Sequence, residues 1–205
     1  MSDISKFYGG SVLALTGKDS AIIVSDKRLG NNSITVSMQH DRVYKMSDRV
    51  YVGMALFVPD IQMLVRKLSK EVNLFEIGEN RRIEPDEFCS LLSSTLYSNR
   101  FSPSYVDPIV AGIDVQNRPY ICSMDLLGCQ STTNDFCAVG TAEDKLYGLA
   151  EALYTPNMND DELFVAAMQI FLNAIDRDAL SGWGAEAHII SRNRVIKRTV
   201  KSRMD

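Results

Sequence analysis

Several polar residues that could hold or move a proton lie close together where a long amphipathic segment ends: Asp176, Arg177, Asp178 and Ser181. They belong to the stretch Ile175–Gly184, in which Gly182 and Gly184 suit a helix stop where backbones approach closely. This is more hydrogen-bonding capacity than a helix-to-strand turn needs. The local pattern alone favours a well-capped helix end, so a chemical role depends on what the rest of the chain brings to it.

Another candidate carboxylate is Asp26, which follows the apolar strand expected over Ala21–Ser25. It is either a turn residue or a carboxylate aimed by a rigid strand end. The only histidines, His40 and His188, lie far apart, so neither a histidine-dependent triad nor a histidine-rich metal site is expected.

No pair of cysteines has zinc-ligand spacing, and three lie in apolar patterns: Cys89, Cys122 and Cys137. We expect buried free thiols in a reducing compartment. The sequence therefore predicts no metal and no cofactor.

The composition is that of an ordinary soluble globular protein, with 45% apolar and 23% charged residues among 205. A formal net charge of -4 argues against a nucleic-acid partner. No apolar run approaches the length of a membrane span, and the first residues lack the apolar core of a secretory signal. We expect neither nucleic acid nor a membrane as a partner.

Apolar runs and turn signals predict strands and helices in blocks rather than in strict alternation. The expected strands cover 11–16, 21–25, 33–36, 43–46, 50–55, 108–113, 120–124, 136–139, 185–190 and 195–200. Helices are expected after Pro59-Asp60, at Glu84-Pro85, from Gly140-Thr141, and from an Asn159 cap to residue 175. This order favours an α+β fold with two antiparallel sheets face to face and helices outside, in one domain.

With these elements, the chain resembles the beta-type subunits of the proteasome, which are N-terminal nucleophile hydrolases. The resemblance covers nearly the whole chain and rests on four segments: Gly9-Gly10, Ser25–Arg28, Gly140–Ala142 and Asp176–Gly182. Within the family, Asp125–Cys129 and Ala179–Gly184 are most similar to the non-catalytic type-3 subunits. The resemblance implies a four-layer αββα sandwich, with a short leader over 1–9 and a single domain over 10–205.

Active members of this family attack the peptide carbonyl with a threonine hydroxyl exposed as residue one, and its free amine serves as base. An α-amino group titrates near roughly 7.7–8.0, so no histidine is needed. By resemblance, Asp26 matches the aspartate that holds the catalytic lysine. Asp178 and Ser181 match the pair that holds the terminal amine, and Thr141 falls where active members commonly have serine.

The resemblance fails at the positions that the chemistry needs most. The nucleophile position holds Gly10, which has no side chain, and the lysine position holds Arg42, which stays protonated. Near the expected oxyanion glycine the chain reads Ala55-Leu56-Phe57. We therefore expect no catalytic residue, with Asp26, Thr141, Asp178 and Ser181 kept as structural remnants.

The resemblance implies a structural subunit of the 20S core beta ring, which supports ATP-dependent, ubiquitin-linked protein degradation through catalytic neighbours. Expected partners are alpha and beta subunits in stacked heptameric rings, with unfolded polypeptides as indirect partners, in cytoplasm and nucleus. Contacts are expected at loop 100–105 and tail 197–205, although the tail could equally be a solvated end. Asp125 and Cys129 could border the trypsin-like neighbour's pocket, or Asp125 could be a turn carboxylate.

Two other interpretations remain. The chain could be an active hydrolase that uses Ser11 after cleavage behind Gly10, but alternation along the strand predicts that this hydroxyl points away from Asp178 and Ser181. The chain could also be a free-standing α/β binding protein, which predicts a stable monomer.

Overall fold

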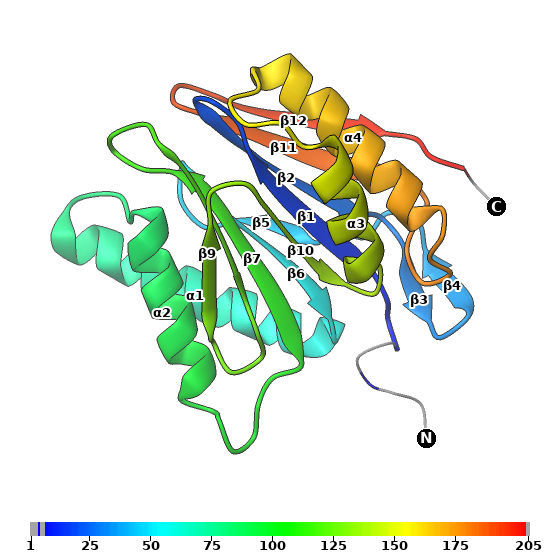
Figure 1. Cartoon of the computed structure of the whole chain (residues 1–205). Coiled ribbons are helices and arrows are strands. Elements are labelled where there is room, and N and C mark those ends of the chain that lie inside the picture. The colour runs from blue at the N-terminus through cyan, green and yellow to red at the C-terminus, as the bar shows by residue number, and fades with distance from the viewer. Residues whose placement is uncertain (1–3, 5–6, 204–205) are drawn as a thin grey trace.

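The computed structural model describes Ile4 and residues 7–203, and its elements form four layers (Figure 1). One five-stranded antiparallel sheet has the order β10-β1-β2-β11-β12, and a second has the order β5-β6-β7-β8-β9. Helices α3 and α4 pack against the first sheet, and α1 and α2 pack against the second. The predicted αββα sandwich is confirmed.

The strands of the first sheet are β1 (Ser11–Thr16), β2 (Ser20–Asp26), β10 (Phe136–Gly140), β11 (Ala185–Ser191) and β12 (Val195–Val200). Those of the second are β5 (Val43–Lys45), β6 (Val50–Leu56), β7 (Val106–Ile113), β8 (Pro119–Met124) and β9 (Gln130–Thr133). A separate hairpin pairs β3 (Leu29–Asn31) with β4 (Ile34–Ser37). The helices are α1 (Val58–Glu79), α2 (Pro85–Tyr97), α3 (Glu143–Leu153) and α4 (Asp160–Ile175).

Both faces of the central strands are buried, because each sheet has a second sheet on one side and helices on the other. In β1, Val12 and Ala14 face the second sheet, whereas Leu13 and Leu15 face α3 and α4. All four side chains are fully buried. This division of β1 into an inner and a helix-facing side decides where its first residue points.

The helix starts follow the sequence signals. Glu84 and Glu87 form a capping box at the start of α2, and Asn159 accepts hydrogen bonds from two amides in the first turn of α4. Helix α1 begins with a proline in its first turn and ends at Asn80, whose left-handed conformation is a common helix stop.

Several details differ from the sequence predictions. Strand β3 was missed, because Leu29 and Gly30 fit the exit from the preceding strand. Strand β9 was missed because it is a polar, mostly exposed edge strand without apolar alternation. Helix α3 begins at Glu143, two residues after Thr141. Helix α4 ends at Ile175 with Asp176 still right-handed, so Gly182 and Gly184 belong to the following loop and do not stop the helix. Part of the predicted leader (1–3, 5–6) and the last two tail residues lie outside the described residues.

Candidate functional site

The predicted remnant residues meet at one end of the sandwich, where β1 begins and β2 and β10 end. Asp26 is the centre of this cluster and is fully buried. Its Oδ1 accepts hydrogen bonds from the Ser11 amide at 3.0 Å and from Arg42 Nε at 2.8 Å. Its Oδ2 accepts from the amides of Arg28 and Gly182, both at 3.2 Å. One carboxylate therefore joins β1, β2, the segment before β5 and the loop after α4.

Arg42 fills the space next to Gly10. Its guanidinium is fully buried, forms the ion pair with Asp26 and donates from Nη2 to the Arg28 carbonyl. A Cβ atom placed on Gly10 would lie 2.1 Å from Arg42 Cζ, and Gly10 has a φ of +106°. Position 10 thus excludes a side chain twice, by space and by backbone conformation. Among the described residues, Arg42 Nη1 has no hydrogen-bond partner.

The hydroxyl cluster lies on the other side of β1 and includes Ser11. Thr141 Oγ1 and Ser181 Oγ both donate to Asp178 Oδ2 at 2.6 Å. Ser11 Oγ lies 3.0 Å from Ser181 Oγ and accepts from the Ala142 amide at 2.9 Å.

The prediction that the Ser11 hydroxyl points away from Ser181 is therefore wrong. Alternation along β1 holds, because Gly10 faces Arg42 on the inner side and Ser11 shares the helix-facing side of Leu13. The error was to place Asp178 and Ser181 on the Gly10 side. They lie on the helix-facing side, in the loop that follows α4.

The end of the predicted leader lies against the site. The carbonyl of Tyr8 accepts from the Gly30 amide at 3.2 Å, and the carbonyl of Phe7 accepts from the Asn32 amide at 2.8 Å. The Tyr8 ring also contacts that of Phe57. Residues 7 and 8, which precede Gly9-Gly10, therefore bind the backbone of the β3–β4 hairpin.

Leu56, near the expected oxyanion glycine, has a φ of +85°. A leucine rarely adopts this glycine-like conformation, which costs about 1–3 kcal/mol. The backbone therefore keeps a glycine's shape at this position, although the residue is a buried leucine.

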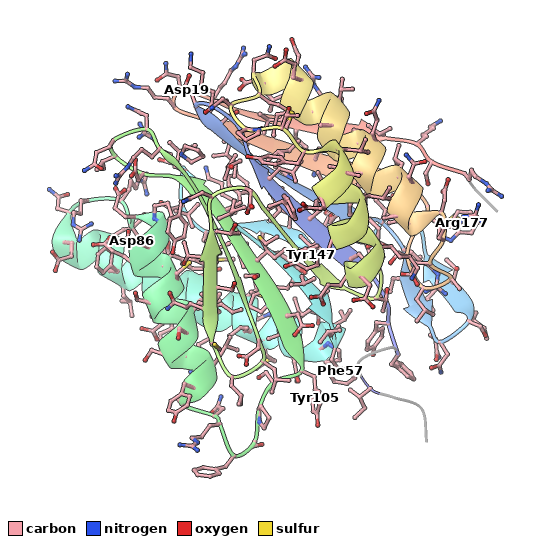
Figure 2. All side chains as sticks on the ribbon, in the orientation of Figure 1. Asp19, Phe57, Asp86, Tyr105, Tyr147 and Arg177 are labelled. Carbon is pink, nitrogen blue, oxygen red and sulfur yellow. The ribbon has the colours of Figure 1, made fainter. Side chains whose placement is uncertain are left out.

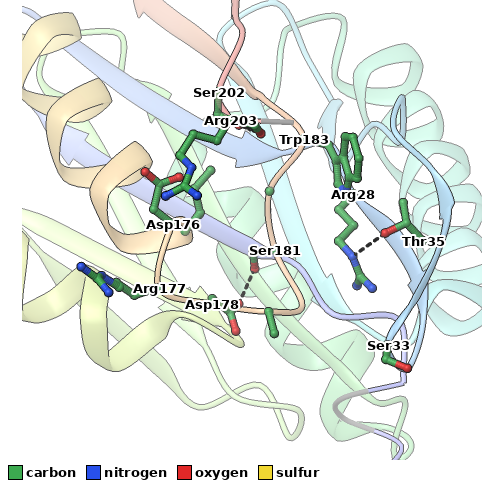
Figure 3. A pocket seen from close by; sticks show the side chains of 13 residues that line it. Arg28, Ser33, Thr35, Asp176, Arg177, Asp178, Ser181, Trp183, Ser202 and Arg203 are labelled. Carbon is green, nitrogen blue, oxygen red and sulfur yellow. Dashed lines mark hydrogen bonds between the residues drawn. The ribbon is translucent and has the colours of Figure 1, made fainter. Parts of the chain in front are cut away.

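A pocket of about 430 Å³ adjoins the cluster, between the loop after α4 and the β3–β4 hairpin (Figure 3). Asp178, Ser181 and Arg28 line it, and Arg28 Nε donates to Thr35 Oγ1 at 3.1 Å. Arg28 also donates to the Leu180 and Asn32 carbonyls. Burial lowers the pKa of Arg28 from its usual value, with Asp26 opposing this shift.

Arg28 was not singled out from the sequence. The Ser25–Arg28 resemblance was the only signal, and the strand exit alone does not reveal that its guanidinium ties the hairpin to the final loop.

Asp125 and Cys129 lie apart from the cluster, in a second pocket of about 310 Å³ that Asp107 and Glu143 also line. Asp125 Oδ1 accepts from the amides of Leu127 and Cys129 at 2.9 and 2.8 Å, which is the geometry of a turn carboxylate. Burial raises the pKa of Asp107 to about 6, and nearby Asp125 adds to the shift.

The remaining titratable candidates form no second centre. Burial lowers the pKa of His40 to about 4, so this ring is neutral at physiological pH. Cys89, Cys122 and Cys137 are buried free thiols, as predicted. Over the described ranges, no group of three or more histidine, cysteine or acidic side chains could hold a metal ion, and no helix could cross a membrane.

Comparison with known proteins identifies the family of this arrangement. The family model described as "Proteasome subunit" matches residues 6–190. This chain belongs to the proteasome subunit family. It is 43% identical over 206 residues to proteasome subunit beta type-3 of Saccharomyces cerevisiae, with all of both chains covered. It is 42% identical over 202 residues to the probable beta type-3 subunit of Schizosaccharomyces pombe, covering 98% of this chain and 99% of that one.

The beta type-3 subunit of Caenorhabditis elegans is 41% identical over 202 residues, again covering 98% of this chain and 99% of the relative. The resemblance to proteasome beta-type subunits, and to type 3 among them, is thereby confirmed. The roles of individual residues are a separate question, which the geometry of the cluster addresses.

Proposed function

We propose that this proteasome subunit is a non-catalytic member of the 20S core beta ring. The observation that carries the proposal is the pairing of Gly10 with Arg42: the nucleophile position has no side chain, and a guanidinium occupies the space that one would need. A protonated guanidinium cannot replace a lysine amine whose proton affinity is tuned. Both losses remove the same chemistry, so they support each other.

The hydrogen bonds of Phe7 and Tyr8, which precede Gly9-Gly10, also support this proposal. Their carbonyls accept from two backbone amides of the β3–β4 hairpin. A chain that keeps its leader has no free amine at position 10, and the reaction of active members needs that amine as its base. Retention of residues 1–9 is thus part of the proposal.

In this proposal the subunit holds catalytic neighbours in place within stacked heptameric rings of alpha and beta subunits. It would act in the ATP-dependent, ubiquitin-linked degradation of unfolded polypeptides, in cytoplasm and nucleus. The remnant cluster then has a structural task, because Asp26, Asp178 and Ser181 fasten the loop after α4 to β1 and β2.

Native mass spectrometry of particles purified from the protein's own cells tests the proposal. We expect this chain in a particle of roughly 28 subunits, by analogy with the family. The intact mass of the released chain should still include Gly9-Gly10. A lone chain near 22.9 kDa would overturn membership of the ring, and a chain that begins at Ser11 would overturn the non-catalytic role.

The Ser11 hydrolase stays as the second candidate, because Ser11 Oγ lies 3.0 Å from Ser181 Oγ. Three features oppose it. The side chain is fully buried, its hydroxyl already accepts from the Ala142 amide, and its nitrogen binds Asp26. An amine created there would form an ion pair with a buried carboxylate, which favours the protonated form and makes it a poor base.

We further propose that Asp125 and Cys129 shape the substrate pocket of a trypsin-like neighbour. Asp125 uses Oδ1 in its own turn, but its carboxylate is exposed and lines the same pocket as Asp107. A carboxylate at that place favours basic substrate side chains. Particles that carry Asp125→Asn should cleave basic substrates more slowly and leave chymotrypsin-like cleavage unchanged. Unaltered cleavage after basic residues would refute this role and leave membership of the ring untouched.

A further inference from the structure

The loop that joins α2 to β7 exposes three aromatic side chains to solvent. We call residues 97–105 the aromatic loop. Phe101 is 92% exposed, and Tyr97 and Tyr105 are 52% and 42% exposed. The loop projects away from both sheets (Figure 1). Full burial of a phenylalanine is worth about 1.5–3 kcal/mol, so this surface forgoes stabilisation that a contact would recover.

Backbone hydrogen bonds fix the conformation of the aromatic loop. The amide of Arg100 donates to the Tyr97 carbonyl at 3.1 Å, and that of Ser102 donates to the Asn99 carbonyl at 2.9 Å. At the base, the Tyr105 amide donates to Asp60 at 2.8 Å, and the Phe57 amide donates to the Tyr105 carbonyl at 3.0 Å. Figure 2 places Phe57 and Tyr105 together at this base. A loop fixed in this way loses little entropy on binding.

Arg100 organises the exposed rings. Its guanidinium carbon lies 5.1 Å from the Tyr97 ring centroid and 4.9 Å from that of Phe101, and its Nη1 donates to the Tyr97 hydroxyl at 2.7 Å. Within the part of the chain that the structure describes, no carboxylate pairs with Arg100. The loop thus presents two rings and one uncompensated positive charge as a preformed unit.

We infer that the aromatic loop is an anchor that inserts into a neighbouring subunit of the same particle. The expected receptor is an apolar hollow that buries Phe101, with a carboxylate at its rim that pairs with Arg100. Tyrosine and arginine are the residue types that dominate binding energy at protein interfaces, and charge complementarity fixes the sign of the partner group. This inference rests on the proposed ring membership and adds which residues make the contact.

A charged, aromatic loop could instead bind polypeptide substrates, but its preformed geometry favours a fixed protein surface. Substrates of a degradation particle vary in sequence, whereas a rigid anchor gains most from one complementary hollow. The single positive charge of Arg100 likewise favours one carboxylate over an extended acidic surface.

Competition during assembly tests the anchor. Cells express the wild-type chain and a mass-distinguishable variant at equal levels, and the ratio of the two in purified particles is measured by mass spectrometry. Phe101→Ala should be under-represented about tenfold or more, as expected from the burial of one phenylalanine. Arg100→Glu should be excluded at least as strongly, whereas Phe101→Leu, which keeps a large apolar side chain, should enter particles better than Phe101→Ala.

Two further measurements separate the possible outcomes. The melting temperature of the free chain should not change in Phe101→Ala, because this ring buries little surface within its own chain. A photoreactive phenylalanine at position 101 should crosslink to an identified subunit in purified particles. Equal incorporation of Phe101→Ala, or a crosslink only to substrate polypeptide, would overturn the anchor and leave ring membership intact. Absence of the wild-type chain from particles would instead refute the proposed function.

Discussion

Restoring a side chain at position 10 should destabilise the protein unless Arg42 is changed as well. In Gly10→Thr, the new Cβ would lie 2.1 Å from Cζ and 2.3 Å from Nη2 of Arg42. The guanidinium cannot move aside cheaply, because it is fully buried and paired with Asp26. The side chain must also be accommodated at a φ of +106°.

The two costs can be added roughly. A strained backbone conformation costs about 1–3 kcal/mol. Separating a buried ion pair costs about 3–5 kcal/mol, because each charge loses its partner. The sum of roughly 4–8 kcal/mol is comparable with the whole free energy of unfolding of a typical domain, about 5–15 kcal/mol. Gly10→Thr alone should therefore fold poorly.

The double variant Gly10→Thr/Arg42→Lys should be more stable than Gly10→Thr. A lysine removes the planar group that blocks position 10 and keeps a positive charge near Asp26. Only the backbone strain then remains, so the double variant should recover the ion-pair cost of about 3–5 kcal/mol relative to Gly10→Thr.

Urea unfolding of the wild type, both single variants and the double variant measures this coupling. Fluorescence of the sole tryptophan, Trp183, reports on it, since Trp183 lines the pocket beside the cluster. Additive effects of the two substitutions, within about 0.5 kcal/mol, would refute steric exclusion by Arg42.

Two further substitutions have defined outcomes. Asp26→Asn should lower the free energy of unfolding by about 3–5 kcal/mol, because it leaves the buried Arg42 charge unpaired; a loss below about 1 kcal/mol in urea unfolding would contradict this. Asp107 has a folded-state pKa of about 6, above its usual value, so its ionisation destabilises the fold as pH rises through 6. Asp107→Asn should therefore stabilise the chain at pH 7.5 by about 1 kcal/mol, after allowance for partial exposure, and this gain should shrink toward pH 4.5 in parallel melts.

The sequence predicted most elements because burial imposes periodicity on them. Strands β1 and β2 are buried throughout and their central residues are apolar, since a strand between a sheet and a helical layer is buried on both faces. Capping residues marked the starts of α2 and α4, whereas α3 has no side-chain cap and begins two residues after Thr141. Strand β9 lacked any such signal because it lies at a sheet edge, where polar side chains remain exposed.

The site was predictable as a set of residues but not as an arrangement. Sequence resemblance indicated that Gly10 and Arg42 depart from the active pattern. It could not reveal that the guanidinium occupies the space beside Gly10, because this contact joins the residues directly before β1 and β5 and depends on the packing of the two sheets. The direction of Ser11 failed for the same reason: alternation fixes relative facing along one strand, but not which face receives the loop after α4.

In the proposed non-catalytic role, the contacts of Asp26 hold this end of the sandwich together. Asp26 accepts four hydrogen bonds, from Arg42 and from three amides that belong to β1, the segment after β2 and the loop after α4. A carboxylate so fully engaged is held in one arrangement. Substitutions that free Asp26 from these hydrogen bonds would therefore loosen the loop that carries Asp178 and Ser181.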